Sequence, residues 1–363
     1  MTIRPPLILD QLAARIVELA IGDTIDGNLI EGYIGRNLLI NGNMDFFQRG
    51  SAGTRPDGES FTLDRWLFAS LGTGTSNWGV GTFAIGDALP VPHPPRFFQG
   101  VNVVAGTNSA WVRQKIENVW SYAGGKATLS FWMRSAVAGK KVGVRLVQDF
   151  GGGSGASPAI NIEGPVFTLT TAFQKYTATF DVPSLVGKTV GASAVNDCLQ
   201  IIFDFAAASG YGNQLVGQTG LFEFTQVQFE RGATATSFDR RPLALELMLC
   251  QRYYEKSYAV DVAPGTATRS GGHVSSALTG YLLAAPLVRF ATTKRATPSV
   301  TLYNTQNGAA GQVSENGGDG LHTYNKPAAV DSVSTGSFEV FVSNGTASPG
   351  NIERVQWAAD AEL

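Results

Sequence analysis

The stretch KATLSFWMRSAVAGKKVGVRLVQDF, residues 126–150, decides the fold class of this chain. In its first half Leu129, Phe131 and Met133 point one way if the chain is extended, and the residues between them point the other way. A period of two is the repeat of a β-strand with one buried face. Ala138-Gly139-Lys140 then supplies a turn, so the stretch predicts two strands.

The same pattern recurs in PVFTLTTAFQKYTATFDVP (165–183), CLQIIFDFAA (198–207) and GLFEFTQVQFERG (220–232). Glycine-rich connections at residues 151–158 and 209–220 separate these segments. Many short strands without interleaved helices predict an antiparallel β-sandwich. We assign it to residues 37–241.

The composition agrees with a mainly all-β protein. Charged residues make up 15% of the 363 residues, against about 25% in average soluble proteins, and there are 43 glycines. The net charge is −2 and no segment is strongly basic, so nucleic acid is not expected as a ligand. The sequence contains no apolar run of about 18 residues, so no membrane-spanning helix is predicted. Cys198 and Cys250 are expected to be buried free thiols.

Residues 1–36 are predicted to form an attachment and trimerisation segment with a short helix. In LILDQLAARIVELA (7–20), Leu9, Leu12, Ile16 and Leu19 fall at spacings of three, four and three, which is one apolar stripe of a helix. A lone helix of this length is marginal in water. The stripe therefore packs either on its own chain or in a bundle of identical helices at a trimer axis. The N-terminus lacks the pattern of a secretory signal, so an extracellular role is expected to depend on another route, such as host lysis.

The C-terminal third returns to strands after a break. Leu243, Leu247 and Cys250 share one helical face, so residues 242–257 are predicted to be a linker helix. Residues 258–363 are predicted to form a smaller β-sandwich domain, the tip, with strands within 276–290, 297–304, 337–344 and 351–363. Residues 304–325 contain few apolar side chains and are predicted to be a surface loop, either a binding loop or a disordered tip.

Catalytic motifs are missing from the sequence. The three histidines are scattered, and neither a nucleophile elbow nor a Walker loop is present. Carboxylates are available, but their spacing does not pair them for glycoside cleavage. We therefore predict that the protein is not an enzyme.

Tryptophans give the clearest indication of a binding site. Trp66, Trp78, Trp111, Trp120 and Trp132 all fall within residues 60–135. Sugars bind by stacking on aromatic rings and by hydrogen bonds from polar side chains, whereas the alternative role for each ring is to fill the core. Trp66 is expected to be core. The predicted carbohydrate-binding residues are Trp78, expected to be exposed among small polar residues, Trp111 and Arg113, expected on one face of a strand, and Trp120 and Tyr122.

Five motifs in order resemble the carbohydrate-binding jelly-roll modules of bacteriophage tail fibres and related virion appendages. They are GRNLLINGNMDFFQRG, FTLDRW, SFWMRSAVAGKKVGVRL, FTLTTAFQKYTATFDVP and FEFTQVQFERGATATSFDRRP, and they cover about residues 36–242. The ending WAADAEL is similar to that of many phage fibre proteins. The resemblance implies a jelly roll, a trimeric appendage and recognition of host surface polysaccharide. It implies no catalytic residues.

The resemblance also bears on metal and on residues 37–50. In related modules the first strand and an acidic pair in the last strand hold a structural calcium ion. Asp45 occupies the comparable first-strand place, but Gln226 and Gln228 stand where the acids are expected, which argues against calcium because it prefers charged oxygen ligands. No other cofactor is predicted. Residues 37–50 are predicted to be the first strand, turned at Asn41-Gly42 and paired with the last strand.

The leading hypothesis is a homotrimeric phage tail fibre or fibre-like appendage that binds host cell-surface polysaccharide without cleaving it. Residues 1–36 would attach it to tail or baseplate proteins, and it would be assembled in the host cytoplasm and act outside the cell as part of the virion. The alternatives are a purely structural virion component, such as a head fibre, collar or adaptor, and a polysaccharide depolymerase.

Overall fold

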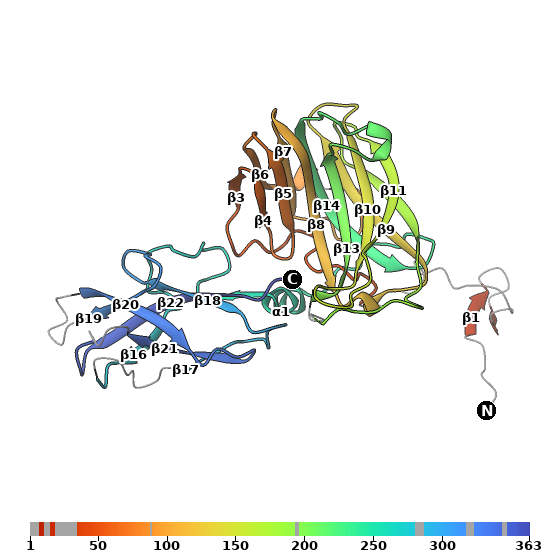
Figure 1. The fold of residues 1–363 in the computed structure, drawn as a ribbon. Helices are drawn as coiled ribbons and strands as arrows, with labels where there is room; N and C mark the ends of the chain where they lie inside the picture. The colour runs from red at the N-terminus through yellow and green to blue at the C-terminus, as the bar shows by residue number, and fades with distance from the viewer. Residues whose placement is uncertain are drawn as a thin grey trace.

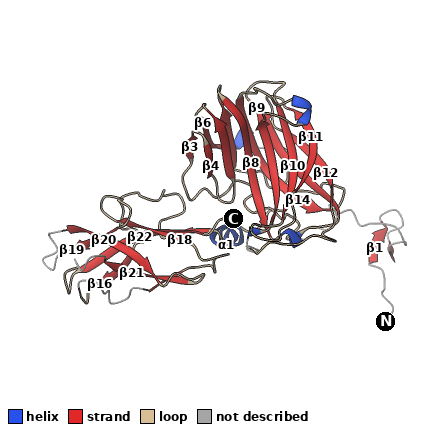
Figure 2. Ribbon diagram, in the orientation of Figure 1, coloured by secondary structure: helices blue, strands red, loops and turns tan. Residues whose placement is uncertain are grey.

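The structure is a computed structural model that describes residues 7–10, 15–18, 35–87, 89–192, 196–279, 287–316, 323–342 and 347–363. Strands dominate these residues, and the α-helix α1 (Leu243–Gln251) lies between a large β-sandwich and a smaller C-terminal β domain (Figures 1 and 2). The prediction of a mainly β protein is confirmed. A helix is present within the predicted linker 242–257, but it ends at Gln251, and Tyr254–Lys256 of the predicted helix form a strand. Within the described residues, none of the helices has the length and apolar character needed to span a membrane.

The sandwich consists of two six-stranded antiparallel sheets. Sheet I has the strand order β11-β10-β13-β8-β5-β4, and sheet II has the order β12-β9-β14-β7-β6-β3. The strands of sheet I are β4 (Gly58–Phe61), β5 (Leu67–Gly72), β8 (Thr107–Glu117), β10 (Lys141–Asp149), β11 (Ile160–Thr168) and β13 (Cys198–Ala206). The strands of sheet II are β3 (Ala52–Arg55), β6 (Ser76–Thr82), β7 (Phe97–Val103), β9 (Gly125–Ser135), β12 (Gln174–Val182) and β14 (Gly220–Arg231). Short 3₁₀ turns occur at η2 (Ile85–Asp87), η3 (Val119–Ser121) and η5 (Tyr211–Asn213).

Consecutive strands repeatedly change sheet, as they do in a jelly roll. β9 lies in sheet II and β10 in sheet I, and β11 and β12 are divided in the same way. The turn predicted at Ala138-Gly139-Lys140 therefore carries the chain from one sheet to the other.

The core fills the space between the two sheets. Leu129, Phe131 and Met133 of β9 are fully buried, as their alternation predicts. The Phe131 ring meets the Phe203 ring of β13 edge-on at 4.8 Å, a favoured aromatic geometry. Trp66 is also fully buried, which confirms its assignment to the core. Cys198 and Cys250 are buried free thiols as expected, and burial raises the pKa of Cys198 to about 12.

The predicted first strand at residues 37–50 has the predicted partner but not the predicted conformation. Leu38 N donates to Phe229 O of β14 at 2.9 Å, so the segment does lie along the last strand of the sandwich. It forms no strand, because Asn41 and Met44 have φ values of 56° and 61°, which break an extended chain.

Gly42 explains how closely this segment approaches β14. Its carbonyl accepts a hydrogen bond from Val227 N at 2.8 Å, and a Cβ at this position would lie 2.2 Å from Val227 O. β14 bulges between Thr225 and Gln228, where its register with β9 shifts. The bulge leaves Val227 free to bond the segment instead of β9.

The prediction of a helix within residues 1–36 is wrong at residues 7–10 and 15–18, which are the residues of the predicted helix that the structure describes. β1 (Leu7–Asp10) and β2 (Arg15–Glu18) form a two-stranded antiparallel sheet, in which Ile8 lies opposite Val17 and Leu9 opposite Ile16. The other residues of the predicted helix lie outside the described residues. The three-four spacing is compatible with a helix, but β-branched Ile and Val favour strands.

The C-terminal domain is organised around β22. The strands described here are β15 (Tyr254–Lys256), β16 (His273–Ser276), β17 (Leu287–Arg289), β18 (Ser299–Asn304), β19 (Gln312–Asn316), β20 (Thr323–Asp331), β21 (Ser337–Val342) and β22 (Ile352–Asp360). β22 pairs with β16 and β19 along its first half and with β15 and β18 along its second half. The strands predicted within 297–304, 337–344 and 351–363 are confirmed. Residues 280–286 of the remaining predicted strand lie outside the described residues.

The surface loop predicted at residues 304–325 is wrong at β19. Val313, Ser314 and Glu315 have no exposed surface, and β19 pairs with both β20 and β22. The segment was hidden from sequence reasoning because two of these three buried side chains are polar.

We expect Asn41→Ala to destabilise the sandwich by about 3 kcal/mol, because it leaves several buried polar groups without partners. The Asn41 amide donates to Phe46 O at 2.7 Å and to Asp64 O at 3.1 Å, and it accepts from Phe46 N at 3.0 Å. Urea unfolding followed by tryptophan fluorescence measures the effect. Asn77→Ala, at an exposed position of β6, is the control, and an equal loss in both variants would contradict the prediction.

Candidate functional site

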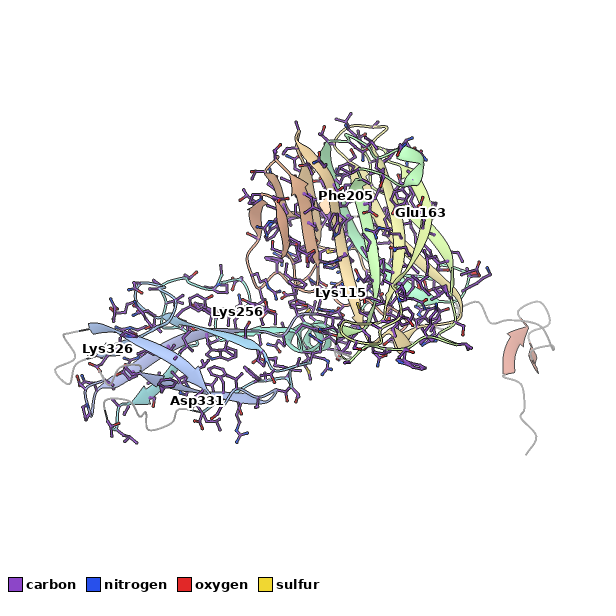
Figure 3. All side chains as sticks on the ribbon, viewed as in Figure 1. Lys115, Glu163, Phe205, Lys256, Lys326 and Asp331 are labelled. Carbon is purple, nitrogen blue, oxygen red and sulfur yellow. The ribbon has the colours of Figure 1, made fainter. Side chains whose placement is uncertain are left out.

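Sheet I carries a polar face on the side away from the core. Alternate residues of β8 from Ala110 to Ile116 are buried in the sandwich, so Trp111, Arg113 and Lys115 project to the other side. We call this side the outer face of sheet I. Lys115 on β8 and Glu163 on β11 are labelled on this sheet in Figure 3.

One row of hydrogen bonds crosses this face. The Arg113 guanidinium donates from Nη2 to both carboxylate oxygens of Glu59 on β4, at 3.0 and 2.8 Å. Its Nη1 lies 3.4 Å from Oε1 of Gln200 on β13. The Gln200 amide donates in turn to Asp149 Oδ2 on β10 at 3.1 Å. The row thus links four strands and holds the Arg113 side chain flat against the sheet.

A second row runs parallel to the first. Arg145 Nε on β10 donates to Asp204 Oδ2 on β13 at 2.8 Å, and the Tyr211 hydroxyl donates to the same oxygen at 2.6 Å. The Tyr211 ring lies over Gly143, where a Cβ would stand 2.7 Å from ring atoms. Burial and the neighbouring Asp204 raise the pKa of Tyr211, so the hydroxyl remains a donor.

Trp111 lies between the two rows. The β-sheet register places it opposite Asp204 on one side and opposite Ala69 of β5 on the other. Its ring is half-buried, and its indole N–H donates to no acceptor among the described residues.

An aromatic ring between rows of polar groups is an arrangement that suits a ligand with apolar faces and many hydroxyl groups. Carboxylates accept and guanidinium and amide groups donate, so hydroxyls can bond to either. Arg113 and Arg145 are each paired with a carboxylate. The face therefore has little unbalanced charge where these pairs lie, which favours a ligand recognised by its hydroxyls over one recognised by its charge.

The other predicted binding residues lie elsewhere. Trp78 of β6 is in sheet II, on the same side as the buried Val101, and packs half-buried against the core next to Gly53. Trp120 is 66% exposed on η3, beyond the end of β8. Of the five predicted residues, the structure brings together Trp111 and Arg113.

Tyr122 is a core residue by its contacts. Its side chain is 3% exposed, its ring meets Phe229 edge-on at 6.1 Å, and its hydroxyl donates to Lys126 O. The Arg231 guanidinium lies 4.7 Å from the centre of the ring. No sugar ring can stack on a face that is covered in this way.

Sequence reasoning missed Arg145, Gln200, Asp204 and Tyr211. The alternation within β10 and β13 is readable from the sequence and places Arg145 and Asp204 on the side of the sheet away from the core. The sheet order β10-β13-β8 is not readable, because these strands come from distant parts of the chain. Tyr211 lies in a glycine-rich connection that carries no periodic signal.

The residues around Asp45 do not fit a calcium ion. Asp45 Oδ2 accepts a hydrogen bond from Asn43 at 2.9 Å, and burial raises the pKa of the carboxyl group. The amides of Gln226 and Gln228 donate to protein oxygens and offer no charge. In the described part of the chain, no group of three or more His, Cys, Asp or Glu side chains is placed to hold a metal.

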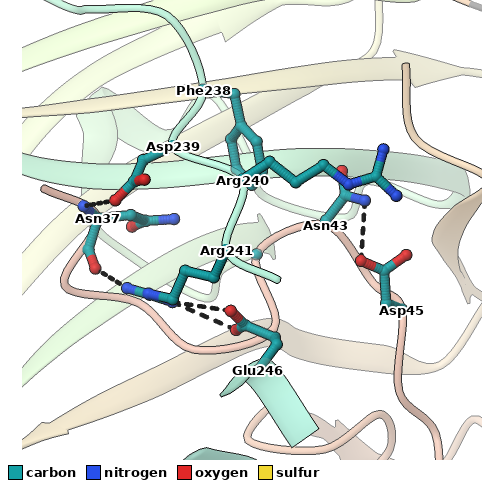
Figure 4. Close-up of a pocket in the computed structure, with 9 residues that line it drawn as sticks. Asn37, Asn43, Asp45, Phe238, Asp239, Arg240, Arg241 and Glu246 are labelled. Atoms are coloured by element: carbon teal, nitrogen blue, oxygen red, sulfur yellow. Dashed lines mark hydrogen bonds and ion pairs between the residues drawn. The ribbon is translucent and has the colours of Figure 1, made fainter. Parts of the chain in front are cut away.

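Arg241 supplies the positive charge at this place (Figure 4). Its guanidinium donates to Asn37 O, to Leu39 O at 2.9 Å and to Glu246 Oε2 at 3.0 Å. These oxygens belong to residues 37–50 and to α1, so the side chain joins the two. A guanidinium with fixed geometry thus satisfies a set of oxygens that a bound cation would otherwise have to satisfy.

No protein-family model matches the chain, and no curated protein sequence matches it. Among solved structures, the enzymatically active domain of tailspike protein 4 from bacteriophage CBA120 is similar, with a TM-score of 0.32 and 14% identity over 54% of this chain and 22% of that chain. The N-terminal cellulose-binding domain of Cellulomonas fimi β-1,4-glucanase C is similar with a TM-score of 0.28 and 15% identity, over 43% of this chain and 99% of that chain. The family 11 carbohydrate-binding module of Clostridium thermocellum, in complex with a β-1,3-1,4-mixed-linked tetrasaccharide, gives a TM-score of 0.30 and 13% identity over 49% and 97%. At these identities and TM-scores the likeness assigns no function to this chain.

We expect Arg241→Ala to destabilise the protein by about 3 kcal/mol, because it leaves Glu246 as an uncompensated buried charge and two carbonyls without a donor. Thermal and urea unfolding measure the loss. Arg240→Ala is the matched control, since Arg240 makes a 3.4 Å bond to Pro94 O and lies half-exposed. Stabilisation of the unmodified protein by added calcium would contradict the assignment of Arg241 as the resident cation.

Proposed function

We propose that this chain is a structural virion protein, a phage tail fibre or fibre-like appendage, that binds host cell-surface polysaccharide through the outer face of sheet I and does not cleave it. The observation that carries the proposal is the Trp111 ring, set between two rows of hydrogen-bonding side chains on a sheet face. The five motifs that resemble phage appendage modules support it, because they fall within the sandwich that carries this face.

Trimerisation through the N-terminal segment is part of the proposal. β1 and β2 form a sheet of two strands, and such a sheet is marginal on its own in water. Its open edges are suited to pairing with other chains. Three linked binding faces would also raise a weak affinity for a repeating polysaccharide through high effective concentration. Residues 1–36 would in addition contact tail or baseplate proteins.

A purely structural virion role is the second candidate. It is favoured by the pairing of Arg113 with Glu59 and of Arg145 with Asp204, which compensates these charges without a ligand. A binding measurement separates the two candidates, because a structural component has no affinity for host glycan.

We expect Trp111→Ala to weaken binding to host lipopolysaccharide or capsule by about tenfold or more, equivalent to about 1.4 kcal/mol. The ring provides the stacking surface, so Trp111→Phe should retain most of the affinity. Titration of purified polysaccharide against the full chain measures the effect. Trp120→Ala is the control, because it removes an exposed indole that lies beyond the end of β8.

Three results would overturn parts of the proposal. Unchanged binding by Trp111→Ala would remove the site from the outer face of sheet I, and weaker binding by Trp120→Ala would relocate it. Absence of binding by the unmodified protein would favour the purely structural role. Release of reducing ends from host polysaccharide would show a depolymerase.

We expect the full chain to have three times the mass of one chain in solution, measured by light scattering. A variant that begins at residue 36 should have the mass of one chain, because it lacks the proposed trimerisation segment. A monomeric full chain would contradict the trimer, and a trimeric shortened chain would move the trimer contacts into the sandwich or the C-terminal domain.

A further inference from the structure

Two glutamates face each other at one end of the core of the C-terminal domain. Glu315 of β19 lies directly opposite Glu353 of β22, and their exposed fractions are 0% and 2%. Glu353 lies on the same side of β22 as the core residue Val355, and Glu315 on the same side of β19 as the core residue Val313. The pair therefore closes the core at the end where Lys326 is labelled in Figure 3.

The hydrogen bonds around the pair are unequal. Glu315 Oε2 accepts from Ser348 N at 2.7 Å, and Lys326 Nζ lies 3.7 Å from Glu315 Oε1. Neither carboxylate oxygen of Glu353 accepts a hydrogen bond from any described residue. Two buried carboxylates in direct opposition cannot both be ionised without a large cost. Glu353 needs a donor, and the group opposite it on β19 is another carboxyl.

We propose that Glu315 and Glu353 share one proton, and that this proton holds β19 to β22 so that this end of the domain opens more readily as the pH rises. A proton between two carboxyl groups makes a short, charge-assisted hydrogen bond. The inference is independent of the proposed glycan binding. The pair is also unlike the carboxylates of glycosidases, which stand about 5–9.5 Å apart around an accessible bond.

The groups around the pair shift the two pKa values in opposite directions, so one of the two carboxyls keeps its proton near neutral pH. Burial raises the pKa of Glu353 to about 8, and the adjacent Glu315 adds to the increase, whereas the positive charge of Lys326 opposes it. Burial also opposes ionisation of Glu315, but hydrogen bonds from Glu353, Ser348 and Asn351 outweigh it and lower its pKa. Lys326 comes from β20, and β16 places the uncharged Ser275 opposite Glu353. Glu353 is thus the protonated member near neutral pH.

The direction of the pH dependence follows from these values. Between pH 4.5, the ordinary pKa of a glutamate, and about pH 8 the closed pair keeps a proton that the opened chain releases. The stabilisation is complete below pH 4.5 and is lost as the pH rises through about 8, at up to about tenfold per pH unit in the opening equilibrium.

The test compares the full chain with Glu353→Gln, whose amide donates to Glu315 without a bound proton. Glu339→Gln is the matched control, since Glu339 is a half-exposed glutamate on β21. Infrared spectra should show a protonated carboxyl band at pH 7 in the unmodified protein and in Glu339→Gln, and not in Glu353→Gln. Protection factors of the β19 and β22 amides, corrected for intrinsic exchange, should fall by up to about tenfold per pH unit from pH 5 to 8 in the first two and stay level in the third.

Other outcomes would overturn the proposal. No protonated carboxyl band at pH 7 in the unmodified protein would show that both carboxyls are ionised. Equal pH dependence of protection in Glu353→Gln would assign the effect to other groups. Stabilisation of the unmodified protein by calcium at pH 7, absent from Glu353→Gln, would show that a cation and not a proton occupies the pair.

Discussion

The structure depends on one constraint: residues 37–50 are largely buried without forming a strand, so their backbone groups need partners from other parts of the chain. Gln114 of β8 bonds both the N–H and the C=O of Ile40, at 2.7 and 2.8 Å. Asn37 bonds Val227 O and Phe229 N of β14. A regular strand would satisfy these groups by its own ladder. Here each bond fixes the segment to a different element, so the segment sets the relative position of sheet I, sheet II and α1.

The same segment carries the junction with the C-terminal domain. The Gln48 carbonyl accepts from the buried Lys256 ammonium at 2.7 Å, and the Gln48 amide donates to Tyr254 O at 3.1 Å. Arg49 stacks on the Tyr254 ring at 3.7 Å and pairs with Asp360. Arg65 stacks on Tyr253 and pairs with Glu362 in the same manner. Planar guanidinium groups that stack and pair at once leave little freedom for two domains to rotate, so the domains are held by direct contacts as well as by the helix between them.

The sequence predicts features that depend on neighbouring residues of one strand, and it fails for features that depend on the pairing of distant segments. The alternation in residues 126–150 survives in the fold because the strand β9 buries one face. The N-terminal stripe misled because Leu9 and Ile16 fit both a helix and a strand pair, and only pairing decides between them. β19 was hidden because Glu315 is buried by a partner, Glu353, that lies far along the chain. Of the predicted site, Trp111 and Arg113 share a face because they are two residues apart on one strand, whereas Arg145 and Asp204 join them through sheet order, which the sequence does not contain.

Buried polar groups thus receive their partners in three different ways in this protein. On the outer face of sheet I, guanidinium and carboxylate groups pair with each other on both sides of Trp111. At residues 37–50 the positive charge belongs to a side chain, Arg241, which donates to backbone carbonyls of this segment and to Glu246 of α1. This charge is part of the chain and cannot dissociate from it. At Glu315 and Glu353, Lys326 lies beside the first carboxyl, and the proposed hydrogen-bonding partner of the second carboxyl is a proton. Of the three, only the proton is exchanged with solvent, so the C-terminal domain is the part of the molecule whose closure follows the surrounding pH.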